Sequence, residues 1–145
     1  MKAYLDTNVL IAASVREHPH HAPALDLVRA VIAGAIDGCI STHGMAEYYS
    51  VATRTPFIPR VHPAEAERFL TQSILPYFEL LALSADDYKE VIRACAGSGR
   101  VGALVFDALH LQCARKAGCD RIYTFNVRDF RVLASPDWIG KIAAP

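Results

Sequence analysis

The first twelve residues constrain the fold more than any other stretch of this chain. An apolar run closes at Leu5, Asp6 follows it, and the polar pair Thr7 and Asn8 separates it from a second apolar run. This pattern predicts a buried strand, then a turn into a helix, because Thr and Asn are frequent helix N-caps. In open parallel α/β sheets, ligands bind at the carboxyl ends of the strands. Asp6 is therefore either a simple helix cap or a functional acid, and later parts of the chain have to decide.

The composition fits one water-soluble domain that spans residues 1–145. The chain is 52% hydrophobic and holds 15 basic and 15 acidic residues, so its net charge is zero and no overall polycation indicates nucleic-acid binding. A chain of this length buries roughly two-thirds of its unfolded surface without disulfides. The four cysteines form no CxxC pair, which is typical of free thiols in a cytoplasmic protein. No apolar run is long and uncharged enough to cross a membrane.

Short apolar segments alternate with helical patterns along the whole chain. We expect strands at 2–5, around 39–40, at 77–83 and at 120–125, with a short edge strand at 138–142. Helical spacing and N-cap residues predict the segments between them, including 43–53, 85–97 and 106–116, to be helices. Such alternation predicts an α/β fold with three layers, α/β/α, in which helices cover both faces of a four- to five-stranded parallel sheet.

Three acids occupy comparable places in this predicted fold. Asp6 follows a strand, Glu47 lies on the helix after the second strand, and Asp107 lies in the first turn of the helix before the last long strand. Asn126 and Asp129 follow that strand. Right-handed crossovers bring these strand ends to one edge of the sheet. Clustered carboxylates need a cation, and oxygen ligands select Mg²⁺ or Mn²⁺, which hydrolyse phosphodiesters by activating water.

Each acid also has a purely structural explanation. Glu47 lies near the capping-box position of its helix, and the helix dipole favours Asp107 in a first turn. His110, one turn beyond Asp107, is typical of a packed helix residue rather than of a catalyst. The agreement of several acids at one edge favours the metal site over separate structural roles.

Four segments carry a resemblance to a known family: LDTNVL at 5–10, the helix with Glu47, FDALHL at 106–111 and YTFNVRDF at 123–130. In order and spacing they resemble the PIN domain and, more narrowly, the VapC-type toxins of bacterial toxin–antitoxin pairs, over essentially the whole chain. The resemblance implies a Mg²⁺-dependent endoribonuclease, with Mn²⁺ as an alternative ion, that cuts RNA by water attack. It also implies a cognate antitoxin and a homodimer, for which Tyr48, Tyr49, Phe57 and Phe69 are contact candidates unless they belong to the core.

The resemblance also implies roles for individual residues. Asp6 and Asp107 are expected to be the metal ligands, and Glu47 to complete the shell or orient the attacking water. Asn126 stands where many relatives carry a fourth acid, and Asp129 lies three residues further. Either of these two residues fills the fourth catalytic position.

Three residues are expected to contact the RNA. Arg128 lies beside the predicted site and suits a phosphate. Thr7 and Thr124 offer hydroxyl groups to a phosphate or to a water molecule, although both also fit ordinary turns.

Two other functions remain open. The neutral side chain of Asn126 favours a catalytically weak PIN-like domain that binds RNA or a protein without cutting. A phosphohydrolase with Asp6 as covalent nucleophile usually requires a second acid two residues later, where this chain has Asn8.

Overall fold

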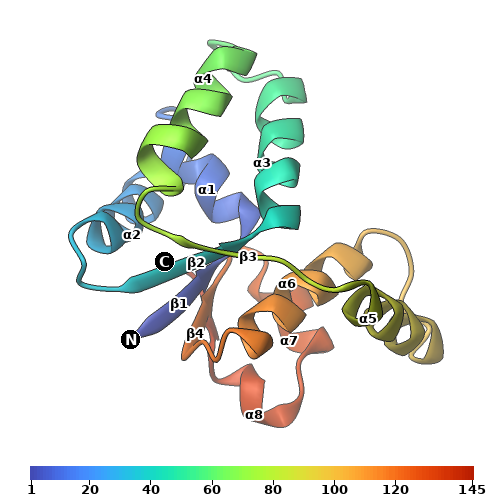
Figure 1. Ribbon diagram of the computed structural model, residues 1–145. Coiled ribbons are helices and arrows are strands. Elements are labelled where there is room, and N and C mark those ends of the chain that lie inside the picture. Colours follow the sequence, from blue (N-terminus) through green and yellow to red (C-terminus); the bar gives the residue numbers. More distant parts are fainter.

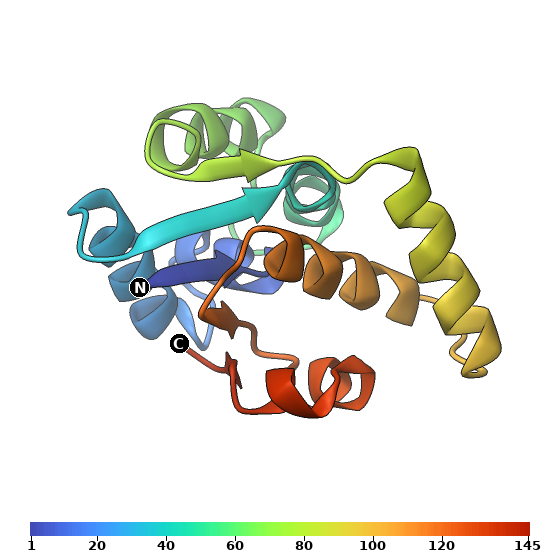
Figure 2. The same ribbon diagram turned by 60° about the horizontal axis from the view of Figure 1, so that its bottom comes forward.

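A five-stranded parallel sheet forms the centre of the computed structural model, which describes residues 1–145. Its strands are β1 (Lys2–Leu5), β2 (Asp37–Ser41), β3 (Glu79–Leu81), β4 (Arg121–Tyr123) and β5 (Ile142–Ala143). They lie in the order β3-β2-β1-β4-β5, and all neighbouring pairs are parallel. The first strand of the chain is thus the central strand of the sheet, with its neighbours on either side (Figure 2). The predicted parallel α/β fold is confirmed.

Helices cover both faces of the sheet (Figure 1). One side carries α1 (Thr7–Ser14), α2 (His21–Ile32), α3 (Thr42–Arg54), α4 (Pro63–Arg68) and its continuation η1 (Phe69–Ile74). The other side carries α5 (Ala85–Gly97), α6 (Leu104–Lys116), α7 (Val127–Leu133) and α8 (Pro136–Ile139). No helix combines the length and the apolar character that crossing a bilayer requires.

The central strand β1 divides the core into two parts. Ala3 and Leu5 pack with α1, α2 and α3, whereas Tyr4 packs with α6 and α7, where it meets Phe130 in the same cluster. All four side chains are buried. Successive strand residues point to opposite faces, so a strand that is apolar from Ala3 to Leu5 needs a helical layer on each side.

The C-terminal region departs from the prediction of an edge strand at 138–142. Pro136–Ile139 form α8, and only Ile142–Ala143 pair with β4. Pro136 is at the start of the helix, where its fixed φ angle favours helical geometry and its missing N–H costs nothing. Trp138 is buried in the core from this helix rather than from a strand.

The four aromatic candidates for partner contacts differ in exposure. Tyr48 is fully buried and packs with the core, whereas Tyr49, the next residue on α3, is 43% exposed. Phe57 and Phe69 are partly buried against the core cluster that contains Tyr48. Tyr49 is therefore the aromatic residue of this set with the largest surface available to a partner.

Candidate functional site

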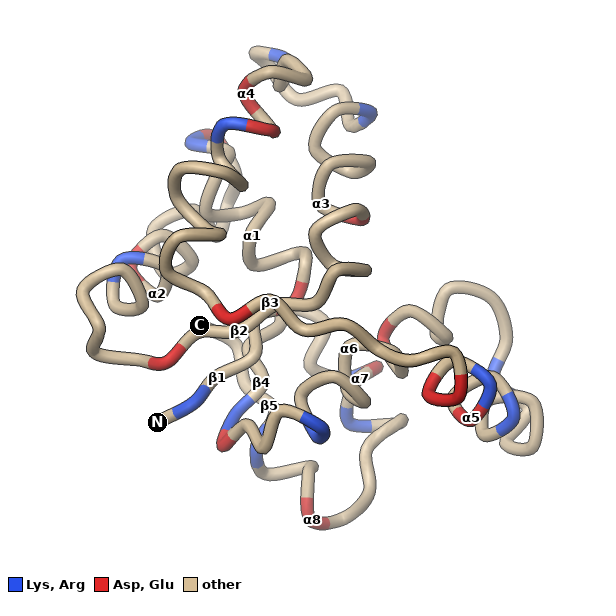
Figure 3. The backbone as a smooth tube through the Cα atoms, viewed as in Figure 1, with Lys and Arg blue, Asp and Glu red and all other residues tan.

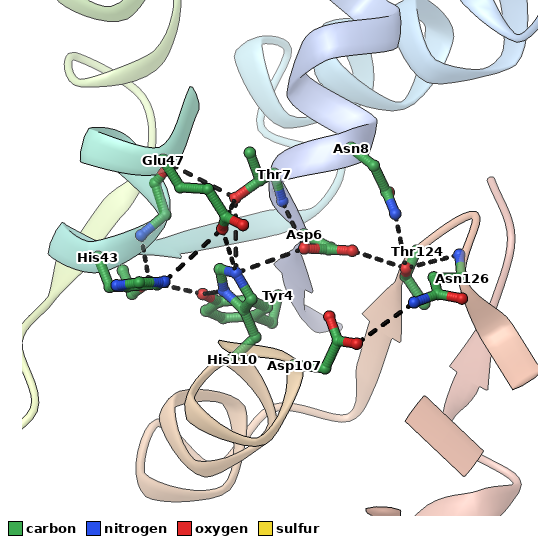
Figure 4. A network of polar contacts seen from close by, with 12 residues as sticks. Tyr4, Asp6, Thr7, Asn8, His43, Glu47, Asp107, His110, Thr124 and Asn126 are labelled. Carbon is green, nitrogen blue, oxygen red and sulfur yellow. Dashed lines mark hydrogen bonds and ion pairs between the residues drawn. The ribbon is translucent and has the colours of Figure 1, made fainter. Parts of the chain in front are cut away.

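Asp6 is both a helix cap and a buried acid. It follows β1 as the N-cap of α1, and its Oδ1 accepts a hydrogen bond of 2.7 Å from the backbone N–H of Thr7. Its Oδ2 accepts a hydrogen bond of 2.7 Å from the hydroxyl of Thr124. Burial raises the pKa of Asp6, while the positive charge of His110 and these hydrogen bonds oppose the rise. The two interpretations of Asp6 are thus compatible (Figure 4).

Thr124 fixes Asp6 because its own hydroxyl is fixed by two further donors. The side-chain amide of Asn8 donates to Thr124 Oγ1 over 3.1 Å, and the backbone N–H of Asn126 donates over 2.9 Å. The Oδ1 of Asn8 in turn accepts from the backbone N–H of Phe125 over 3.1 Å. The turn after β1 and the turn after β4 therefore form one hydrogen-bonded unit, in which the Thr124 hydroxyl donates its hydrogen bond to Asp6 Oδ2.

Glu47 belongs to a second polar chain on the other side of Asp6. Its Oε2 accepts from the hydroxyl of Thr7 over 2.8 Å and lies 2.8 Å from Nε2 of His110. Nδ1 of His110 lies 2.7 Å from the hydroxyl of Tyr4, which donates to Ser41 Oγ over 2.8 Å. This chain joins β1, α3 and α6, so it sets the distance between the helices that carry the acids.

Glu47 and His110 form an ion pair. Burial by itself raises the pKa of Glu47, but the hydrogen bond and the charge of His110 outweigh it, and the pKa is lowered overall. Burial lowers the pKa of His110, but the hydrogen bond to Glu47 and the charge of Asp6 outweigh it, and the pKa is raised overall. His43 lies nearby, and burial together with the charge of His110 lowers its pKa. The buried positive charge thus resides on His110.

Asp107 is the acid with the fewest partners. It lies in the first turn of α6, half-buried, and accepts one hydrogen bond of 3.3 Å from the side-chain amide of Asn126. Burial and then the negative charge of Asp6 raise its pKa from 3.8 to about 7. A carboxylate in this state requires an additional cation to stay charged at neutral pH.

The acids line two adjoining hollows that share Glu47 and Asp107. The first, of about 190 Å³, is lined by Asp6, Thr7, Asn8, Ile11, His18, Glu47, Val51 and Asp107. The second, of about 310 Å³, is lined by Glu47, Val101, Ala103, Leu104, Phe106, Asp107, Asn126 and Asp129. The structure therefore brings all five predicted catalytic residues to one region, at the carboxyl ends of β1 and β4.

The residues of the first hollow fit a hard divalent cation. Asp6, Glu47 and Asp107 present only oxygen atoms, the ligands that Mg²⁺ and Mn²⁺ prefer. Asp107 in addition lacks a positively charged partner of its own, as its raised pKa indicates. A cation between these carboxylates would offset both the burial of Asp107 and the negative charge of Asp6, which together raise the pKa of Asp107.

Basic residues are scattered among acidic ones along the trace (Figure 3). Arg128 is exposed at the start of α7, next to Asp129, which lines the second hollow. Any cationic contact with a ligand in this region therefore comes from individual residues such as Arg128.

Sequence reasoning placed Asn8 in the turn after Asp6 and Ser41 at a helix cap, but it missed the supporting roles of Tyr4, His43 and His110. A signal existed for the two histidines. His110 lies three residues after Asp107 and His43 lies four residues before Glu47, so each shares a helix face with an acid. Tyr4 carries no such signal, since its contact with His110 depends on how α6 crosses the sheet.

Comparisons with known proteins agree with this geometry. The PIN domain family matches residues 3–135. The chain is 35% identical over 107 residues to Ribonuclease VapC27 of Mycobacterium tuberculosis, covering 72% of this chain and 71% of that protein.

Solved structures share the fold at lower identity. The Mycobacterium tuberculosis VapC20 structure, described as a sarcin-ricin loop cleaving toxin, has a TM-score of 0.70 at 16% identity and covers 88% of this chain and 92% of its own. The structure of VapBC2 from Rickettsia felis, bound to a DNA fragment from its promoter, has a TM-score of 0.67 at 19% identity, with coverage of 100% and 99%.

Proposed function

The chain belongs to the PIN domain family, and within it to the VapC type, and on this premise we propose that it is a metal-dependent endoribonuclease, the toxin of a toxin–antitoxin pair. The observation that carries the proposal is the convergence of Asp6, Glu47 and Asp107, from three separate elements, on one hollow. A single cap or surface acid requires no such convergence.

Asp6 and Asp107 would hold Mg²⁺ or Mn²⁺, and Glu47 would complete the shell or orient water. When bound, such an ion supplies Lewis-acid stabilisation of the phosphate and lowers the pKa of water. Thr7 and Thr124 keep the Asp6 carboxylate in one orientation through their hydrogen bonds. This rigid placement is what catalysis by positioning requires.

Glu47 is suited to take the proton of the attacking water. Its Oε2 already accepts from Thr7 and His110, which leaves Oε1 for a water molecule. Its lowered pKa keeps it ionised at neutral pH. Attack of that water on phosphorus, with departure of the 3′ oxygen, gives products with a 3′-hydroxyl and a 5′-phosphate.

The fourth catalytic position and the RNA contact belong to the turn after β4. We assign Asn126 to the fourth position, because its amide already donates to Asp107, and Asp129 to the rim of the second hollow. Arg128, exposed beside them, is assigned to a phosphate of the RNA.

We also propose partners and a cellular location for this chain, on the basis of its family. The Rickettsia felis structure is one of VapBC2, which supports a cognate antitoxin as partner of this chain. A homodimer and action in the cytoplasm are part of the proposal. Tyr49, exposed on α3, is the contact that we assign to such a partner.

An RNA cleavage assay with the purified chain tests the proposal. We expect cleavage in Mg²⁺ or Mn²⁺, none in EDTA, and none in Asp6→Asn or Asp107→Asn. Asp86→Asn is the matched control, because Asp86 is an exposed acid on α5 whose ion pair with Lys89 lies at the surface. Cleavage that persists in EDTA would disprove the metal mechanism.

The non-cutting alternative rests on one observation, the neutral Asn126 beside Asp107. Retention of RNA or antitoxin without cleavage under all metal conditions would favour it over the nuclease.

A further inference from the structure

We propose that His43, Glu47 and His110 form a second metal site, which adjoins the acidic hollow through Glu47 and takes a borderline-soft divalent cation such as Zn²⁺. One ligand atom from each residue lies within 4.8 Å of the other two. Two imidazole nitrogens with one carboxylate oxygen form a ligand set that Zn²⁺ uses with a water molecule in the fourth position.

The spacing of the three atoms suits coordination. Glu47 Oε2 lies 2.8 Å from His110 Nε2 and 3.7 Å from His43 Nε2. Ligand atoms about 2 Å from a tetrahedral zinc ion lie roughly 3.3 Å apart. The two distances to Glu47 differ from this value by about 0.5 Å or less, and the ligand atoms of the two histidines lie within 4.8 Å of each other.

Nε2 of His43 is the observation that points to a ligand. This atom is buried and has no hydrogen-bond partner. An unpaired buried nitrogen destabilises the fold unless something satisfies it. The ring is held in place by stacking on Phe106, with centroids 5.2 Å apart, and by an edge contact with His110, with centroids 5.4 Å apart.

His110 has the support that metal-binding histidines have. Such a histidine donates its second ring N–H to an oxygen, which fixes its orientation. Nδ1 of His110 lies 2.7 Å from the Tyr4 hydroxyl, which is itself anchored on Ser41. An ion at Nε2 replaces the proton that His110 shares with Glu47, so binding releases that proton.

The two sites differ in chemistry but share one residue. The acidic hollow offers Asp6 and Asp107, all oxygen, whereas the second site offers two nitrogens. His43 and Glu47 are four residues apart on α3, on one helix face, and His110 reaches them from α6 (Figure 4). The two proposed sites therefore adjoin at Glu47, and His110 Nε2 also lies 3.5 Å from Asp6 Oδ1 of the acidic hollow.

The test measures binding of metal ions to the metal-free full-length chain, without RNA. Calorimetry with Zn²⁺ gives the stoichiometry and affinity, and visible absorption with Co²⁺ reports a tetrahedral site with nitrogen ligands. We expect one Zn²⁺ per chain and Co²⁺ bands in the wild type. His43→Ala and His43→Phe are expected to weaken Zn²⁺ binding at least 10-fold and to abolish the bands.

The controls separate this site from the acidic one and from a folding defect. His43→Phe removes the nitrogen but keeps a ring against Phe106, and a thermal melt checks that it is folded. Asp107→Asn and His62→Asn are expected to bind Zn²⁺ as the wild type does, because Asp107 belongs to the other site and Asn preserves the N-cap that His62 provides to α4.

Equal Zn²⁺ affinity in the wild type and both His43 variants would overturn the proposal. Loss of Zn²⁺ binding in Asp107→Asn would also overturn it, since the ion would then lie in the acidic hollow. The result does not depend on nuclease activity. A chain that binds Zn²⁺ through His43 but does not cut RNA would disprove the proposed function and leave the zinc site standing.

Discussion

The two aspartates of the candidate site differ in how completely the protein supports them. Asp6 is 4% exposed, and both of its oxygens accept hydrogen bonds of 2.7 Å. Asp107 is half-buried, accepts one hydrogen bond of 3.3 Å from an amide, and has a pKa raised to about 7. The protein thus fixes one carboxylate by itself and leaves the other with a single weak hydrogen bond. In the proposed mechanism the first carboxylate determines the geometry, and the second depends on the cation for its charge.

The largest expected effect is on cleavage. A bound metal supplies several kcal/mol of transition-state stabilisation, so Asp6→Asn and Asp107→Asn are each expected to reduce RNA cleavage by at least about 100-fold.

The two positions should also differ in their effect on the free energy of unfolding. Asp6→Ala loses an N-cap worth about 1 kcal/mol, whereas Asp107→Ala is expected to stabilise the metal-free chain by removing a repelled charge. Urea denaturation in EDTA measures this contrast, and equal destabilisation by both variants would contradict it.

Removing the support of Asp6 is expected to have the next largest effect. Thr124→Val preserves the volume but removes the hydrogen-bond partner of Asp6 Oδ2, of the Asn8 side-chain NH₂ and of the Asn126 N–H in a partly buried region. We expect a loss of about 1–3 kcal/mol in the free energy of unfolding.

The matched control for Thr124→Val is Thr53→Val. Thr53 is partly exposed, and its hydroxyl bonds only to carbonyls of its own helix. A change within about 0.5 kcal/mol is expected there. Equal losses in the two variants would show that Thr124 has no special role.

The pH dependence of stability separates Asp107 from the other acids. Its pKa in the folded chain, about 7, lies above the ordinary value of 3.8, so folding favours the protonated form. This contribution is present below about pH 4 and is lost as the pH rises through about 7. In EDTA the Tm of the wild type should therefore fall, relative to that of Asp107→Asn, between these two pH values.

Glu47 and His110 titrate in both proteins, so subtracting the Tm of Asp107→Asn from that of the wild type at each pH removes their contribution to first order. Saturating Mn²⁺ should remove the difference, because the cation stabilises the charged form of Asp107. A difference independent of pH would mean that Asp107 titrates normally.

The smallest effect is expected at the fourth position. Asn126→Asp replaces a donor to Asp107 by a charge, which should tighten Mn²⁺ binding several-fold, about 1 kcal/mol, and lower the stability of the metal-free chain. Calorimetry of Mn²⁺ binding measures the change. If Asp129→Asn weakens Mn²⁺ more than Asn126→Asp strengthens it, Asp129 is the residue that fills the fourth position.

The sequence predicted the parts of this molecule that depend on local patterns. The strands at 2–5 and 120–125 and the cap at Ser41 follow from apolar runs and polar residues that end them, and β1, β4 and α3 confirm them. The parallel sheet then brings Asp6 and Thr124 to the same edge. These inferences needed no knowledge of how helices pack.

The contacts between layers were not predictable in this way. The bonds from His110 to Glu47 and Tyr4 depend on how α6 and α3 approach β1, which a local pattern does not specify. Helix α8 was missed because its four residues are too few for a periodic signal, and the apolar Trp138 fits a strand equally well.

The hydrogen bonds of Asn8 to Thr124 and Phe125 have a consequence for synthesis of the protein. Asn8 bonds to residues 116 and 117 positions later in the chain, on the far side of β4. While the ribosome is still making the middle of the chain, Asp6 has no Thr124 to orient it and no Asp107 beside it. The proposed site is therefore incomplete in the nascent chain, and it forms only after the segment that follows β4 has left the ribosome.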